Sequence, residues 1–312
     1  MTTHKLIINP IANKGGASAL IPAIEAELDK YQVDYDIDLT QYPWHAAEIT
    51  SRAIAEGFST VVAIGGDGTV NEVLNGIMLA QKAGHGTAKM GVIPIGRGND
   101  FSFSMGVPQT LSESCAALAA GETRTIDVGF LRGGLYPEGR YFGNGVGIGF
   151  DAMVGFVASQ GKLTGFMGYL VAAIKTIYLF FPAPVMEIAF DGETLTAPAL
   201  MVSIMNGVRM GGGFMMAPKG ISNDGLFDLT IARAVSRMET FKLIPRFIKG
   251  DQESHPAIHM KKSSKVVVRA LEGKLPIHAD GETICVECGE IEVEIMPNKI
   301  DLIVRPDLIP NK

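Results

Sequence analysis

Short apolar runs and amphipathic segments alternate along the first 130 residues. Strands are predicted where the runs are rich in β-branched residues, at residues 5–9, 33–39, 61–64, 90–94 and 125–128. Helical periodicity follows three of these strands, with one helix at residues 45–56 and another opening near Thr69. Strands that alternate with helices at this spacing predict a parallel, doubly wound α/β sheet, and such sheets bind ligands beyond the carboxyl ends of their strands.

The pattern changes after residue 130, where strand-like runs with glycine-rich turns dominate. We expect antiparallel strands at residues 140–146, 185–190, 199–206, 226–232, 265–270 and 291–295. Two helices interrupt them, at residues 163–181 and 238–249. One face of the first helix is apolar, with Met167, Leu170, Val171, Ile174, Tyr178 and Phe181. We interpret both helices as packing in a core or a domain contact rather than on a membrane.

Composition narrows the class of protein. With 312 residues, 47% of them hydrophobic and 19% charged, the chain is long enough for two domains with cores of their own. A net charge of −6 with scattered basic residues argues against a nucleic-acid partner. Three cysteines and no secretory signal pattern favour the cytoplasm. The longest apolar stretch contains Lys175 and two glycines, so no transmembrane segment is expected.

The strand at residues 61–64 leads into Gly65-Gly66-Asp67-Gly68-Thr69-Val70-Asn71-Glu72. Here Thr69-x-x-Glu72 is typical of a capping box that opens a helix. Glycines let a ligand approach bare backbone, and the free amides of a helix start attract an anion such as phosphate. The Asp67 carboxylate would repel a nucleotide unless a cation such as Mg²⁺ lay between them. The turn therefore predicts a site for a nucleotide and a metal.

Similar acidic turns follow two more strands of the predicted sheet. Asp100 lies in Gly96-Arg97-Gly98-Asn99-Asp100-Phe101, and Asp127 lies in Ile126-Asp127-Val128-Gly129. We expect Asp67, Asp100 and Asp127 to converge at one edge of the sheet. The turn from Asn9 to Gly16 is a weaker candidate for anion binding, and it lacks the ending of a Walker loop.

These motifs occur together in one known family. The chain resembles the diacylglycerol kinase catalytic family, specifically the soluble bacterial lipid kinases related to diacylglycerol and sphingosine kinases. The resemblance rests on the motifs above and on Asn206-Gly207, Gly211-Gly212-Gly213, Asn223-Asp224-Gly225-Leu226 and Asp280-Gly281-Glu282. It extends from Asn9 to Glu282 and so covers nearly the whole chain.

The resemblance implies two domains with the active site in the cleft between them. Residues 1–130, with 299–312 returning, would form an ATP-binding α/β domain. Residues 131–298 would form a mostly antiparallel, β-sandwich-like domain for the lipid substrate. The implied reaction transfers the γ-phosphoryl group of ATP to a lipid hydroxyl.

The resemblance also implies roles for individual residues. ATP would contact Asn9, Pro10, Ile11, Ala12, Asn13, Thr40, Gly65, Gly66, Asp67, Gly68, Thr69, Val70, Asn71, Glu72 and Arg97. The carboxylates of Asp67, Asp100 and Asp127 would organise Mg²⁺, and Glu282 would be the general base. A second, structural Mg²⁺ would bind the carbonyls of Ile221 and Leu226 and the carboxylate of Asp224. Phosphoryl transfer depends mainly on positioning and charge neutralisation, which suits these groups.

Two residues depart from the family pattern. Arg97 replaces a common threonine, and it could clamp a phosphate or crowd the nucleotide pocket. Trp44 stands where similar proteins usually have glycine, which bears on Thr40 as an ATP contact.

Three other signals favour structural roles. Residues 147–152 match a loose dinucleotide fingerprint but lack the surrounding βαβ unit, so we expect a glycine turn. Cys285-x-x-Cys288 has no second pair for a metal, and His278 is interpreted as an ordinary strand residue.

The main hypothesis is an ATP- and Mg²⁺-dependent lipid kinase in the cytoplasm that meets its substrate at the inner membrane surface. An NAD kinase shares the glycine-rich acidic turn and is the alternative enzyme. A catalytically silent lipid- or nucleotide-binding protein on the same scaffold is the third hypothesis. The lipid is open between diacylglycerol, monoacylglycerol, phosphatidylglycerol, a sphingoid base and a polyprenol, and a homodimer, as in similar bacterial proteins, is possible.

Overall fold

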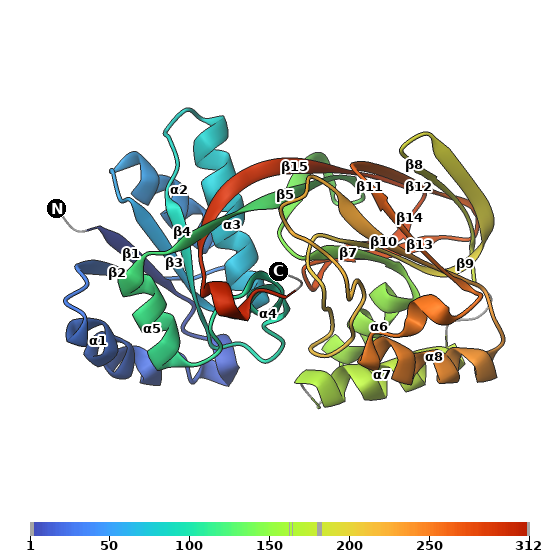
Figure 1. Ribbon diagram of the computed structural model, residues 1–312, viewed down its shortest axis with the longest axis horizontal. Helices are drawn as coiled ribbons and strands as arrows, with labels where there is room; N and C mark the ends of the chain where they lie inside the picture. Colours follow the sequence, from blue (N-terminus) through green and yellow to red (C-terminus); the bar gives the residue numbers. More distant parts are fainter. Residues whose placement is uncertain (1–2, 162, 164, 180–182, 311–312) are drawn as a thin grey trace. The chain divides into compact units, whose positions relative to one another are not determined.

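The computed structural model describes residues 3–161, 163, 165–179 and 183–310 (Figure 1). The chain divides into two units. Unit 1 comprises Met1–Asp127 and Asn298–Lys312, and unit 2 comprises Val128–Pro297. Each unit has its own buried core and is described separately.

A parallel sheet forms the centre of unit 1. Its strands are β1 (His4–Ile8), β2 (Tyr35–Leu39), β3 (Thr60–Gly65) and β4 (Lys89–Pro94), in the order β2-β1-β3-β4. The end of β15 (Glu290–Ile303) adds a further parallel neighbour, because Leu302 pairs with Met90 of β4. The predicted α/β class of this part of the chain is confirmed.

Helices cover both faces of this sheet. They are α1 (Ile21–Lys30), α2 (His45–Ala55), α3 (Asp67–Lys82), α4 (Asp100–Met105) and α5 (Leu111–Ala120). Short 3₁₀ helices occur at Ala12–Gly15, Ser18–Leu20 and Pro306–Leu308. One face of the sheet packs with α1 and α5, in a core that includes Leu6, Ile64 and Leu118. A Cβ added to Gly76 of α3 would lie only 2.5 Å from Cβ of Thr50 on α2. The side chain of Thr50 therefore packs directly against the backbone of α3.

Unit 2 is mostly antiparallel. Its strands are the second half of β5 (Thr123–Gly133), β6 (Tyr136–Phe142), β7 (Gly145–Gly149), β8 (Val185–Phe190), β9 (Glu193–Met205), β10 (Phe227–Arg233), β11 (Ile258–Ser263), β12 (Lys265–Glu272), β13 (Leu275–Ala279), β14 (Glu282–Cys288) and most of β15. The first half of β9 pairs with β8, and its second half pairs with β7 and β10. Their inward side chains, among them Phe142 and Phe227, form a fully buried core. The predicted β-sandwich class is confirmed.

Several predicted strand boundaries in unit 2 are wrong. The strand expected at residues 140–146 is two strands, β6 and β7, because the chain turns at Gly143 and Asn144. The strand expected at 199–206 is the second half of β9. The strand β11 was not predicted, because its sequence Ile-His-Met-Lys-Lys-Ser has too few apolar residues for a clear alternation.

Three helices pack on unit 2 and lie beside one another in Figure 1: α6 (Phe150–Ser159), α7 (Gly165–Leu179) and α8 (Arg237–Lys249). Their common core includes Val154, Ala173 and Phe247. A fourth, short 3₁₀ helix covers Gln252–Ser254. Among the described residues, no helix is long and apolar enough to cross a membrane.

The face of α7 that we expected to be packed is largely exposed. The residues of α7 that are buried are Gly168, Ala172, Ala173, Thr176 and Ile177. In contrast, Met167, Ile174 and Tyr178 are 56%, 40% and 64% exposed. The prediction was wrong because α7 is apolar on all sides, so its periodicity does not indicate which side packs. Phe181 of the expected helix lies outside the described residues.

Candidate active site

The turn after β3 is built on close backbone contacts. Gly66 precedes α3, which begins at Asp67, three residues before the start at Val70 that a capping box at Thr69 requires. No side chain caps this helix start. Instead, the Thr69 hydroxyl accepts a hydrogen bond of 3.1 Å from Nδ2 of Asn9, at the end of β1. A Cβ on Gly65 would lie 2.3 Å from that hydroxyl, so glycine is required here. The capping-box prediction is wrong, and Thr69 instead joins the ends of β1 and β3.

Glu72 also has a partner outside its own helix. Its Oε2 accepts a hydrogen bond of 3.1 Å from the backbone amide of Ala46, in the first turn of α2. That helix follows Trp44, whose φ of 71° lies in the left-handed region that favours glycine. Nearby, Thr40 is buried, and its amide donates to the carbonyl of Ile8. The structure thus places Glu72 as a link between α3 and α2.

The turn after β4 lies directly against the turn after β3. A Cβ on Gly96 would lie 2.5 Å from Cα of Gly66, which leaves no room for any side chain. The Asp67 carboxylate crosses between the turns, because its Oδ1 accepts a hydrogen bond of 3.1 Å from the amide of Phe101. The two loops are therefore held as one rigid surface of bare backbone at the carboxyl edge of the sheet.

Two of the three candidate metal ligands face the same point. A Cβ on Gly98 would lie 3.1 Å from Oδ2 of Asp67 and 3.5 Å from Oδ2 of Asp100. Asp127 is fully buried, and its Oδ1 accepts a hydrogen bond of 2.8 Å from the amide of Asn298. Within the described part of the chain, no three His, Cys, Asp or Glu residues form a group that could hold a metal. The pair Asp67 and Asp100 fits Mg²⁺, which commonly takes one or two carboxylates and completes its shell with water and phosphate.

The turn after β1 presents mostly backbone. Oδ1 of Asn9 accepts a hydrogen bond of 3.2 Å from the amide of Ile11, whose side chain is exposed. Pro10 leads into the 3₁₀ helix that starts at Ala12, and Asn13 adopts a left-handed φ of 52°. Arg97, in the turn after β4, is also exposed.

In unit 2, the candidate base Glu282 is held by Arg140, which the sequence motifs do not indicate. The Arg140 side chain is only 2% exposed, and its Nη2 donates to Oε2 of Glu282 at 2.7 Å. Nη1 of the same guanidinium donates to the Tyr136 hydroxyl at 2.6 Å. Glu282 is 37% exposed, so one side of this carboxylate faces solvent. A basic residue within a predicted strand was the only signal available in the sequence.

The preceding turn fixes the direction of Glu282. Asp280 and Gly281 both have positive φ, 47° and 84°, in a two-residue hairpin between β13 and β14. The Asp280 carboxylate is buried and accepts hydrogen bonds from three successive amides, those of Gly143, Asn144 and Gly145, at 2.7 to 2.9 Å. This carboxylate therefore anchors the hairpin that carries Glu282.

At the expected second Mg²⁺ site, a lysine contacts the acidic residue. Nζ of Lys262 lies 2.6 Å from Oδ2 of Asp224 and 3.8 Å from the nearest oxygen of Asp228. Burial raises the pKa of the Asp228 carboxyl, and Lys262 opposes that rise. Binding of Mg²⁺ by Asp224 and the carbonyls of Ile221 and Leu226 stays a prediction, and the ion would compete with this ammonium group.

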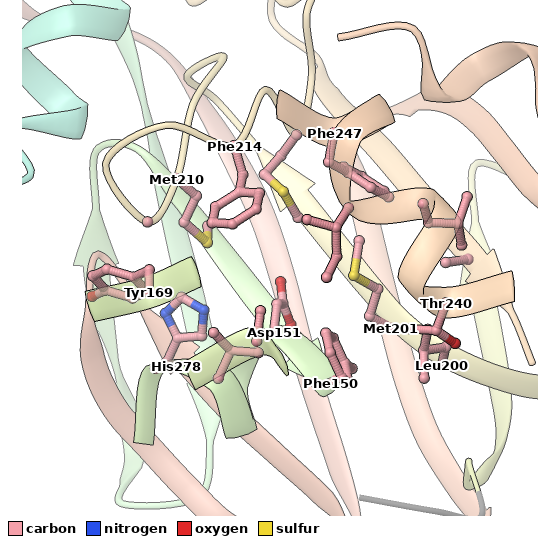
Figure 2. A pocket seen from close by; sticks show the side chains of 18 residues that line it. Phe150, Asp151, Tyr169, Leu200, Met201, Met210, Phe214, Thr240, Phe247 and His278 are labelled. Carbon is pink, nitrogen blue, oxygen red and sulfur yellow. The ribbon is translucent and has the colours of Figure 1, made fainter. Parts of the chain in front are cut away.

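An apolar cavity lies within unit 2 (Figure 2). It holds about 780 Å³ of empty space, its open mouth included. Residues of α6, α7, α8 and β9 line it together with the loop at 210–216, among them Val154, Tyr169, Met201, Phe214 and Phe247. The sequence did not reveal the cavity, because its residues come from seven separate segments, which include β10 and β13.

Few polar groups line this cavity, and two of them are Asp151 and His278. A Cβ on Gly147 would lie 2.3 Å from Nε2 of His278 and 2.4 Å from Oδ2 of Asp151, so both side chains cross the bare backbone there. Burial raises the pKa of Asp151 to about 7, although the Ser203 hydroxyl donates to its Oδ2 at 2.9 Å. Burial also lowers the pKa of His278 to about 4. Gly147, the first glycine of the loose dinucleotide fingerprint at residues 147–152, thus makes room for these two side chains.

The protein thus has an α/β unit with glycine-rich turns at the carboxyl edge of its sheet, and a β-sandwich unit that contains an apolar cavity. Residues 3–131 match the diacylglycerol kinase catalytic domain, and residues 144–304 match the YegS C-terminal NAD kinase beta sandwich-like domain. The chain belongs to the diacylglycerol kinase catalytic-domain family, as its motifs indicated.

Known relatives match along nearly the full chain. A diacylglycerol kinase of Mycobacterium tuberculosis H37Rv is 29% identical over 290 residues, which cover 91% of this chain and 90% of the relative. A solved diacylglycerol kinase from Bacillus anthracis Sterne has a TM-score of 0.76 at 21% identity and covers 99% of this chain and 98% of its own. An Archaeoglobus fulgidus NAD kinase solved with ATP has a TM-score of 0.55 at 13% identity, over 99% of this chain and 96% of its own, and shares the fold alone.

Proposed function

We propose that this protein transfers the γ-phosphoryl group of ATP to the hydroxyl of a diacylglycerol-like lipid in a Mg²⁺-dependent reaction. The observation that favours a lipid is the apolar cavity of unit 2, whose mostly apolar lining suits hydrocarbon chains. Family membership supports the kinase chemistry, and the glycine turns of unit 1 support nucleotide binding.

The phosphates of ATP would lie on the turns after β1, β3 and β4. Gly66 and Gly96 leave backbone exposed to the ligand, and the start of α3 supplies amide donors. Asp67 and Asp100 would hold Mg²⁺, which neutralises phosphate charge when bound. Asp127 is buried against Asn298, so we propose that it acts by fixing the protein around the site rather than by touching the ion.

Glu282 would accept the proton of the attacking hydroxyl. Arg140 holds Oε2 of this carboxylate, which leaves Oε1 for the substrate proton. The buried guanidinium keeps the carboxylate in one orientation. As the hydroxyl oxygen bonds to the γ-phosphorus, the bond from that phosphorus to the bridging oxygen of ADP breaks, and the proton passes to Glu282.

A lipid acceptor requires contact with a membrane, so we propose a cytoplasmic protein that binds the inner membrane surface peripherally. A homodimer stays a proposal taken from similar bacterial proteins. NAD kinase activity is the alternative, because an NAD kinase shares the fold. Apolar cavities discriminate weakly between hydrocarbon chains, so the choice of acceptor needs a direct measurement.

The test is turnover of γ-labelled ATP by the purified chain, with and without Mg²⁺, against mixed micelles of each candidate lipid and against NAD. Label in one lipid class supports the proposal and identifies the substrate. Label on NAD alone overturns it, and ATP binding without any transfer favours a silent scaffold. Glu282→Ala should bind ATP but not transfer phosphate. Glu287→Ala, on the same strand in an exposed ion pair with Lys274, is the matched control and should stay active.

A further inference from the structure

The outer face of α7 is an apolar stripe without a partner in unit 2's core. Met167, Ile174 and Tyr178 follow one another at helical spacing and are 56%, 40% and 64% exposed. Leu179 at the end of the helix is 70% exposed, and Lys175 is the only charged residue of α7. Isolated exposed apolar residues are ordinary, but a stripe along a whole helix marks an interaction surface.

The start of α8 continues this surface. The Tyr178 ring packs edge-on against the ring of Phe241, with 5.9 Å between the ring centroids. On α8, Met238 is 69% exposed and follows the exposed Arg237. The exposed Lys242 lies four residues further on and pairs with Glu239 at 2.9 Å, and the exposed Lys249 is the last residue of the helix. The apolar stripe therefore has basic residues at its border.

We propose that the outer face of α7 and the start of α8 form a docking surface for an anionic lipid bilayer. The charges favour this occupant. Helix α8 has four basic residues and one acidic residue, Glu239, although the whole chain has a net charge of −6. Anionic headgroups would attract this local charge while the apolar stripe enters the boundary of the acyl chains. A second copy of the chain meeting this face across a two-fold axis would bring like charges together.

The cavity supplies the second reason for a bilayer. The same helices that expose the stripe line the cavity with their inner faces, through Tyr169 and Ala173 of α7 and Leu243 and Phe247 of α8. A lipid would therefore pass from a membrane on one side of these helices to the cavity on the other. This argument rests on the proposed lipid kinase function, whereas the stripe and its charges do not.

The experiment is co-sedimentation of the full chain with vesicles of phosphatidylcholine, with and without phosphatidylglycerol. We expect binding that increases with the anionic lipid and decreases with salt. The double variant Met167→Gln and Tyr178→Gln should lose roughly tenfold in vesicle affinity. Leu135→Gln is the control, because Leu135 is 70% exposed and belongs to the turn between β5 and β6 rather than to α7 or α8. Arg237→Ala with Lys249→Ala should lose the preference for anionic vesicles.

Equal vesicle binding by the double variant and the Leu135→Gln control would overturn the proposal. A dimer formed through this stripe would also overturn the proposal. In that case the original chain would not bind vesicles, and mass measurements would show a dimer that the double variant abolishes. Turnover of a short-chain, water-soluble diacylglycerol separates this test from that of the kinase. The double variant should retain turnover of this soluble lipid. If the original chain binds vesicles but never transfers phosphate, the kinase activity is refuted and the docking surface is not.

Discussion

Replacing Asp151 by asparagine should change how the stability of this protein depends on pH. Burial raises the pKa of this carboxyl from 3.8 to about 7. The native state therefore binds the proton at a higher pH than the unfolded state. The resulting stability is fully present below the unfolded pKa and is lost as the pH rises through about 7. Asp151 is half-buried in the wall of the open cavity, so the shift corresponds to at most about 4 kcal/mol of unfolding free energy.

Asparagine has the same shape and no charge. One of its side-chain groups can accept from the amide of Ala152, and the Ser203 hydroxyl can rotate to accept from the other. Asp151→Asn should therefore be more stable than the original protein at about pH 8, and this advantage should disappear toward about pH 4.

The assay is urea unfolding of both proteins across this pH range. His278 adds an opposite trend, since burial lowers its pKa to about 4 and its contribution is lost as the pH falls from 6.5 through that value. Both proteins contain His278, so their difference isolates Asp151. A difference that stays constant with pH would refute the argument, and Glu287→Gln, at an exposed position, should show no pH-dependent gain.

Three further predictions concern the two candidate sites. Gly96→Ala should lower the free energy of unfolding by about 1–3 kcal/mol and weaken ATP binding, because the new Cβ would lie 2.5 Å from the backbone of Gly66. Thermal unfolding and ATP titration test this. Gly289→Ala is the control, because a Cβ at Gly289 would have no atom within 4 Å. Asp280→Ala should cost about 3 kcal/mol, since three amides lose their acceptor, and urea unfolding would disprove this if the midpoint were unchanged. Arg140→Met should reduce kcat with little effect on the KM for ATP, and Arg140→Lys should recover part of the loss; an unchanged kcat would remove Arg140 from a positioning role.

The elements with strong local signals could be predicted from the sequence. The β-branched run at β3 and its glycines located a strand, a turn and a helix, and the alternation of elements gave the parallel sheet of unit 1. The turns that contain Asp67 and Asp100 lie together because the carboxyl ends of parallel strands share one edge. The position of these turns follows from chain topology, which the spacing of elements largely determines.

The missed features depend on contacts between distant segments. Arg140 is 142 positions from Glu282 in the chain, and nothing near either residue indicates their ion pair. Thr69 matched a capping box, but Asn9 from another strand bound its hydroxyl instead. Tertiary packing decides which side of α7 is buried, because the sequence of a helix that is apolar on all sides does not indicate its exposed face.

The order in which the parallel sheet can be completed follows from the division of the chain. Unit 1 includes Asn298–Lys312, which a ribosome makes only after all of unit 2. Until then, β4 lacks the parallel neighbour that Leu302 provides, and the core that Ile303 joins is incomplete. The α/β unit therefore has an unpaired strand edge throughout the synthesis of unit 2, which is a hazard for aggregation during folding. Its native sheet is closed by residues made about 200 positions after β4.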